Sequence, residues 1–146
     1  MKLLLDTDAY SAFMRGHADV VSRVRRAERL CLSVVAVGEL LFGFRVGSRH
    51  ERNLRLLDAF LDNPYVELLP VTRTTADRFG RIAAALRAKG TPIPSNDIWM
   101  AAHAMEAGAE LLSSDAHYRH VDGLAWVRPA DASSRRGTSR AARRRP

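Results

Sequence analysis

Short apolar runs alternate with longer, helix-like segments along most of the chain. The runs at residues 3–5, 30–33, 65–71, 109–112 and 124–127 have the length of β-strands and are bounded by polar residues. The segments between them, at residues 9–15, 19–29, 34–46, 49–61, 75–89 and 97–105, are amphipathic or almost wholly apolar. Such alternation predicts an α/β fold with a single domain, in which helices flank a central parallel sheet of four to five strands.

The first apolar run ends abruptly in acidic residues. Leu3 to Leu5 are followed by Asp6 and, two residues later, by Asp8. A short strand without polar residues is typical of a parallel sheet that is covered on both faces. Ligands of such sheets bind just outside the carboxyl ends of the strands, so we expect Asp6 at that edge and Asp8 close by. The alternative is that both carboxylates only cap the next helix.

Glu39 is the second acid in an apolar setting. It is the only charged residue in the segment 34–44, and no basic residue lies three or four positions away. Because a carboxylate in apolar surroundings is costly unless it is paired or binds a metal, we expect its partner to come from elsewhere in the fold. The alternative is that Glu39 points into solvent.

Two further acids stand at the ends of predicted elements. Asp97 opens the apolar helix that follows the stiff loop at residues 91–96, and Asp115 comes directly after the strand at 109–112 and two serines. A helix N-cap is a strong alternative role for Asp97, although Ser95 and Asn96 would also cap well.

The four acids Asp6, Glu39, Asp97 and Asp115 suggest a shared cation. Carboxylates that meet at one edge of a sheet repel each other, and a divalent ion removes the repulsion. Oxygen ligands suit Mg²⁺, with Mn²⁺ also possible, and an ion with bound waters can promote phosphodiester hydrolysis.

The histidines and the cysteine point to structural roles. We expect His103, on the apolar helix, to be packed or hydrogen-bonded. His117 and His120 are three residues apart, but no nearby Cys or His completes a zinc site. The single cysteine, Cys31, cannot form an internal disulfide and is predicted to be a small buried hydrophobe.

The charge is concentrated in a basic tail. The net charge of the 146 residues is +7, and without the six arginines of residues 133–146 it is about +1. We therefore expect a folded domain over residues 1–132 and a disordered tail over 133–146, which either adds salt-sensitive affinity for nucleic acid or has no specific role. Without a visible signal peptide or membrane-spanning run, the expected location is the cytoplasm and no membrane contact is predicted.

The acidic motifs, taken in order, resemble those of PIN-domain nucleases and are most similar to the VapC toxins of type II toxin–antitoxin pairs. The resemblance runs from Lys2 to Val127 and includes Gly38-Glu39, Asn96-Asp97 and Ser113-Ser114-Asp115 followed by His117-Tyr118. It implies that Asp6, Glu39, Asp97 and Asp115 are the catalytic and metal-site acids. Asp8, Asn96 and Ser113 would lie behind them, and Ser113 stands where the family usually has Thr.

The resemblance also implies a function. The implied function is that of a Mg²⁺-dependent endoribonuclease that acts on RNA and is commonly a homodimer. A VapB-like antitoxin would inhibit it, and operator DNA would be contacted only through that antitoxin. Two alternatives stay open. The first is a phosphohydrolase of the haloacid-dehalogenase type with Asp6 as nucleophile, whose motif wants Thr or Val where Tyr10 stands. The second is a non-catalytic PIN-like protein that binds RNA or a partner.

Overall fold

The computed structural model describes residues 1–131, so the predicted basic tail lies outside the described residues. The described chain has five strands, six α-helices and one short 3₁₀ helix, η1. The strands are β1 (Lys2–Leu5), β2 (Arg29–Ser33), β3 (Val66–Leu69), β4 (Glu110–Leu112) and β5 (Trp126–Val127). The helices are α1 (Thr7–Met14), α2 (Ala18–Arg26), α3 (Val34–Val46), α4 (His50–Asp62), α5 (Arg73–Lys89), α6 (Ser95–Ala107) and η1 (Ala116–His120).

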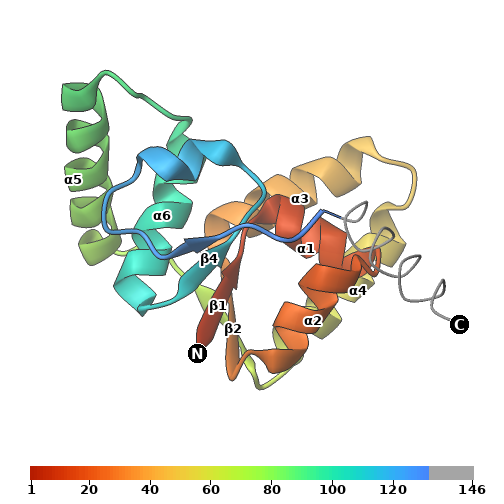
Figure 1. Ribbon diagram of the computed structural model, residues 1–146. Coiled ribbons are helices and arrows are strands. Elements are labelled where there is room, and N and C mark those ends of the chain that lie inside the picture. Colours follow the sequence, from red (N-terminus) through yellow and green to blue (C-terminus); the bar gives the residue numbers. More distant parts are fainter. Residues whose placement is uncertain (132–146) are drawn as a thin grey trace, which may run out of the picture.

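The sheet is parallel throughout and has the order β3-β2-β1-β4-β5. In Figure 1, α5 and α6 lie on one side of the sheet, and α1, α2 and α4 lie on the other. The predicted α/β fold with a flanked parallel sheet is therefore confirmed. Because β1 is central, its carboxyl end lies between those of β2 and β4, which is where ligands of such sheets bind.

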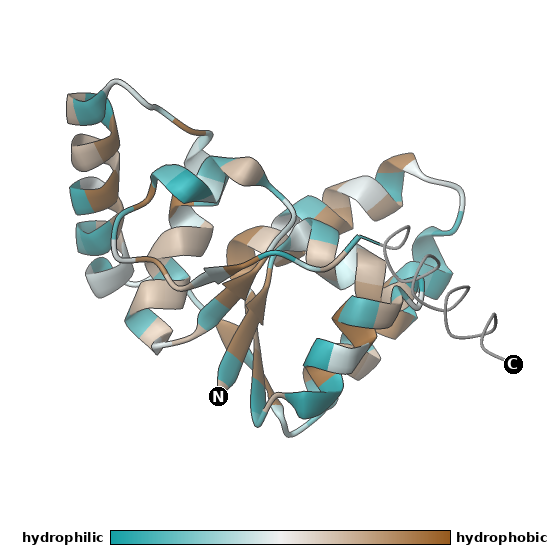
Figure 2. Cartoon of the chain, in the orientation of Figure 1, coloured by the Kyte–Doolittle hydropathy of each residue, from teal (hydrophilic) through white to brown (hydrophobic). Residues whose placement is uncertain are grey.

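The core is built from the apolar strands. Leu4 and Leu5 of β1, Leu32 of β2 and Leu111 of β4 are fully buried, and Figure 2 shows hydrophobic colour along the strands and on the inner sides of the helices. Cys31 is also fully buried, as predicted. None of the helices among residues 1–131 is long and apolar enough to cross a membrane.

Several boundaries differ from the prediction for local reasons. The first helix begins at Thr7 rather than at residue 9, because the Asp6 side chain accepts a hydrogen bond from the Ala9 amide and starts the helix there. The second helix ends at Arg26, and Arg29 instead joins β2 beside Lys2. β3 ends at Leu69 because Pro70 has no amide hydrogen, and β3 is an edge strand of the sheet.

Candidate active site

An acidic pocket lies at the carboxyl ends of the central strands. It has a volume of about 410 Å³ and is formed by α1, α3, the start of α6 and the segment that follows β4. Five of the described residues that line it carry carboxylates. No described residue of the lining is Lys or Arg. These acids are Asp6, Asp8, Glu39, Asp97 and Asp115. The fold thus brings all four predicted site acids, and Asp8, to one pocket.

Asp6 is fixed in place by two hydrogen bonds. Its Oδ1 accepts from the Ala9 amide at 2.7 Å, and its Oδ2 accepts from the Ser113 hydroxyl. The side chain therefore caps α1 and lines the pocket at once, so the two predicted roles of Asp6 are compatible. Ser113 is fully buried, and its Oγ also accepts from the Asp115 amide at 3.0 Å, which ties β1 to the segment after β4.

The charge of Asp6 is poorly compensated. Burial raises the pKa of its carboxyl from 3.8 to about 6, although the bonds from Ser113 and Ala9 act in the opposite direction. The nearby charges of Asp8 and Asp97 are smaller contributions to the same rise of the pKa. Hydroxyl and amide donors thus orient the carboxylate without cancelling its charge.

Glu39 has a partner from another part of the chain, as predicted. The Thr7 hydroxyl donates to its Oε1 at 2.8 Å, across 32 positions of sequence. Glu39 is half-buried, and α3 is held at its start by Ser33, whose side chain accepts from the Val35 amide. The hydroxyl of Thr7 therefore aims the Glu39 carboxylate along the pocket wall.

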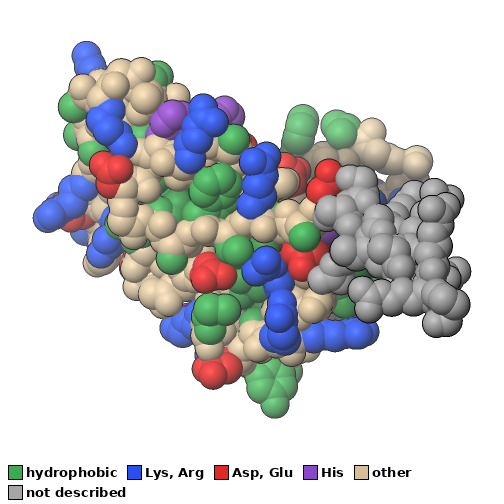
Figure 3. All heavy atoms as spheres, viewed as in Figure 1, with side chains coloured by type: hydrophobic (Ala, Val, Ile, Leu, Met, Phe, Trp, Pro, Cys, Tyr) green, Lys and Arg blue, Asp and Glu red, His purple; other side chains and the backbone are tan. Residues whose placement is uncertain are grey.

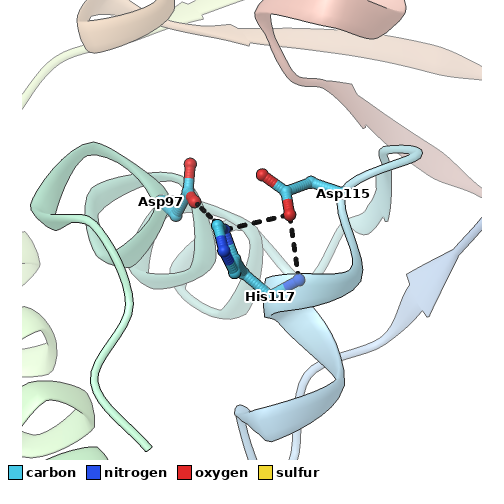
Figure 4. A group of neighbouring side chains, drawn as sticks. All are labelled: Asp97, Asp115 and His117. Atoms are coloured by element: carbon cyan, nitrogen blue, oxygen red, sulfur yellow. Dashed lines mark hydrogen bonds and ion pairs between the residues drawn. The ribbon is translucent and has the colours of Figure 1, made fainter.

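Asp97 and Asp115 meet on the opposite wall, with His117 between them (Figure 4). The His117 Nδ1 lies 3.1 Å from Asp97 Oδ2 and 3.0 Å from Asp115 Oδ1. These three residues form a close group of possible metal ligands, whose ligand atoms lie within 4.8 Å of one another. Asp6 and Glu39 line the same pocket but are not members of this group.

Asp97 does not cap its helix. The helix α6 begins at Ser95, its N-cap is Pro94, and no side chain caps it, so the capping alternative for Asp97 is wrong. Burial raises the pKa of Asp97, whereas the hydrogen bond and charge of His117 lower it. The Tyr118 hydroxyl donates to Asp97 Oδ1 at 3.4 Å, and burial of Tyr118 raises the pKa of its phenol.

Thr7, His117 and Tyr118 are site residues that the sequence did not assign. In the sequence, His117 is half of a possible zinc pair and, with Tyr118, part of the motif that follows Asp115, but neither pattern assigns these residues a role in the site. His120 is not in the close group of possible ligands found among the described residues. Their place in the sequence could have indicated His117 and Tyr118 as site residues, because they follow Asp115 by two and three residues. Asp8 and Asn96 line the pocket from exposed positions.

The fold and the pocket agree with a known family. Residues 3–124 match the model of the PIN domain family. This match spans most of the chain and shows that the chain belongs to the PIN-domain family.

Similar proteins show to which group within the PIN-domain family the chain belongs. Ribonuclease VapC2 of Haemophilus influenzae is 32% identical over 117 residues, which cover 79% of this chain and 87% of the relative. The tRNA(fMet)-specific endonuclease VapC of Salmonella typhimurium is 28% identical and covers 85% of this chain and 95% of the relative. The crystal structure of DNA-bound VapBC from Salmonella typhimurium has a TM-score of 0.78 at 25% identity and covers 88% of this chain and 98% of that chain. The first of these identities places the chain among the VapC ribonucleases.

Proposed function

We propose that this protein is a Mg²⁺-dependent endoribonuclease and the toxin of a toxin–antitoxin pair. The observation that carries the proposal is the pocket in which five carboxylates converge without a Lys or Arg among its described lining residues. Mutual repulsion and burial make such a site costly in the metal-free protein, as the raised pKa of Asp6 indicates. A divalent cation would remove that cost.

The donor set fits a hard cation. Mg²⁺ prefers oxygen ligands, is usually bound through one or two carboxylates and keeps several waters. Asp97 and Asp115 are close enough together to hold it, and Asp6 and Glu39 would bind it directly or through its waters. When bound, such an ion supplies an activated water and stabilises the charge on the phosphate and leaving oxygens.

The chain's own residues prepare the pocket for this chemistry. Ser113 and Thr7 orient Asp6 and Glu39 through hydrogen bonds, so these carboxylates need little rearrangement to bind a cation. His117 holds Asp97 and Asp115 together. These contacts keep the acids preorganised while the pocket stays open to a polynucleotide.

The proposed substrate is RNA. α5 carries five basic residues, Arg73, Arg78, Arg81, Arg87 and Lys89, and Figure 3 shows Lys and Arg side chains around much of the visible face. Such residues attract the phosphate backbone independently of sequence. The name of the Salmonella typhimurium relative makes transfer RNA the first substrate to test here.

The structural neighbours support one of the proposed partners, a VapB-like antitoxin. The Salmonella typhimurium and nontypeable Haemophilus influenzae structures are VapBC complexes, and the former is bound to DNA. We propose that a VapB-like antitoxin inhibits this protein, that operator DNA is contacted only through that antitoxin, and that the toxin forms a homodimer.

The two alternative functions are now weaker. Membership in the PIN-domain family removes the reason for a dehalogenase-type reaction. A non-catalytic RNA-binding role would leave the converging acids without a purpose.

A cleavage assay tests the proposal. Purified protein at nanomolar concentration is incubated with total transfer RNA in Mg²⁺, in EDTA, and in EDTA followed by excess Mg²⁺. We expect cleavage only in the first and third reactions, and no cleavage by the Asp97→Asn variant. Binding of RNA without cleavage in Mg²⁺ or Mn²⁺ would support the non-catalytic alternative instead.

A further inference from the structure

His103 is a buried histidine outside the acidic pocket. It lies on α6, is 1% exposed, and hydrogen-bonds through both ring nitrogens, as its apolar setting predicted. Its Nδ1 lies 2.9 Å from the Ser33 Oγ, and its Nε2 lies 3.0 Å from the carbonyl oxygen of Pro70. We call these two contacts the His103 bridge. It joins α6 to the first residue before α3 and to the end of β3.

The direction of each hydrogen bond follows from the chemistry of the partners. The Pro70 carbonyl can only accept, so the His103 Nε2–H donates to it, and the tautomer that is protonated only at Nε2 presents Nδ1 as an acceptor. The Ser33 hydroxyl then donates to Nδ1, while its oxygen accepts from the Val35 amide at 3.0 Å. Every donor and acceptor of the bridge is thereby satisfied inside the core.

The His103 bridge connects the two helices that carry acids of opposite pocket walls. On α6, His103 comes six residues after Asp97, and on the other side Ser33 comes six residues before Glu39. Six residues of helix correspond to about 9 Å along each axis. Because α3 and α6 pack against each other, a small slide between them would change the offset between Asp97 and Glu39.

Apolar packing alone would fix that offset less sharply. Side chains such as Ala36 of α3 and Ala102 of α6 are buried but offer no directional contact. Hydrogen bonds weaken steeply when their length or angle departs from the optimum, so the bridge defines one relative position of the helices.

We propose that His103 is a positioning residue for the acidic pocket, which sets the spacing of Asp97 and Glu39 by holding α6 to the N-terminal end of α3. The inference rests on the proposed function, since it requires that these acids bind an ion together. Outer contacts of this kind contribute to metal affinity by keeping the ligands in place.

The test compares Mn²⁺ affinity with thermal stability in variants of the full chain. His103→Leu removes both bonds with little change in volume, and we expect it to weaken Mn²⁺ binding by roughly 10-fold in calorimetric titrations. His103→Gln offers an amide donor and a carbonyl acceptor, so it should recover most of that loss. Circular dichroism shows at which temperatures each variant is folded.

Leu86→Ala is the matched control. Leu86 is 2% exposed, lies on α5 and does not line the acidic pocket. Its truncation should lower the melting temperature but leave Mn²⁺ affinity unchanged, which separates loss of positioning from loss of stability.

Three outcomes would overturn the inference. The first is wild-type Mn²⁺ affinity in folded His103→Leu. The second, decisive if that variant does not fold, is wild-type affinity in Ser33→Ala, which removes the bridging hydroxyl. The third is a wild-type protein that binds no divalent ion, which would overturn the proposed function as well and leave His103 nothing to position.

Discussion

The two walls of the acidic pocket hold their carboxylates in different ways. On the wall formed by α6 and η1, Asp97 and Asp115 share the imidazole of His117, the one basic side chain among the described residues of the pocket lining. On the wall formed by β1 and α3, Asp6 and Glu39 are held by the hydroxyls of Ser113 and Thr7. The first wall has a partner that can carry positive charge, and the second has only neutral donors.

This difference shows that a carboxylate can be oriented by hydrogen bonds while its negative charge stays uncompensated. The hydrogen bonds to Asp6 lower its pKa, yet burial outweighs them and the pKa still rises to about 6. The β1–α3 wall is therefore the part of the pocket that most needs a cation, while the α6–η1 wall supplies the close ligand group. A metal ion bound by both walls would compensate the charge on the β1–α3 wall and be held by the ligands of the α6–η1 wall.

The largest expected effect comes from removing a charge from either wall. Asp6→Asn and Asp97→Asn keep the shape of the side chain but lose the anionic ligand. We expect each to lower the rate of RNA cleavage by roughly 100-fold or more, and to abolish growth inhibition on induction. The cleavage rate in Mg²⁺, with circular dichroism as the check on folding, measures this.

Asp77→Asn is the control for that comparison. The Asp77 carboxylate pairs with Arg81 at 2.9 Å on the exposed side of α5. Its loss should change the cleavage rate by less than about twofold. Full activity in both pocket variants would show that neither wall takes part in the reaction.

The second prediction concerns the stability of the metal-free protein. The Asp6 carboxyl titrates at about 6 when folded and near 3.8 when unfolded, so between these values the folded state holds the extra proton. The free energy of unfolding should therefore fall as pH rises from about 4 to about 6 and then level off, by at most about 3 kcal/mol.

Asp6→Asn isolates this contribution from those of other groups. The variant should lack this pH-dependent loss and be more stable than the wild type at neutral pH in EDTA. Urea unfolding across the pH range measures the difference. Parallel curves for the two proteins would mean that Asp6 is not destabilised by burial.

The third prediction tests orientation on the β1–α3 wall. Thr7→Val keeps the shape of the side chain but removes the donor to Glu39. Loss of one hydrogen bond to a charged group should weaken Mn²⁺ binding by roughly 10-fold. Thr7→Ser keeps the hydroxyl and should bind like the wild type, so equal affinity in the Val variant would remove Thr7 from the site.

The smallest expected effect sharpens the contrast between the walls. His117→Ala should raise the pKa of Asp97, because the hydrogen bond and charge of His117 lower it. The pKa of Asp6 should not change, since His117 is not among the causes of its shift. Carbon-detected NMR of the carboxyl groups measures both, and a shift in Asp6 alone would reverse the assignment of the walls.

The sequence predicted the fold because its strands are short apolar runs that end in polar residues. Leu3 to Leu5 show no competing pattern, and Asp6 marks the edge of the sheet directly. Glu39 was identifiable because a lone carboxylate in an apolar helix is unusual. In each case, the signal is local and needs no knowledge of the neighbouring elements.

What could not be predicted depends on contacts between distant segments. The bond from Thr7 to Glu39 spans 32 positions, and the one from Ser113 to Asp6 spans 107. Nothing in the sequence near His117 indicates that α6 brings Asp97 beside it. The capping alternative for Asp97 failed for a local reason instead, since Pro94 and not Asp97 is the N-cap of α6.

The central claim is that both walls bind one divalent ion. Crystals grown with Mn²⁺ and measured at a wavelength where manganese scatters anomalously test it most directly. The account predicts an anomalous peak in the pocket, bound by Asp97 and Asp115 and reaching Asp6 and Glu39 directly or through water. A peak elsewhere, or a pocket without one at saturating Mn²⁺, would contradict it.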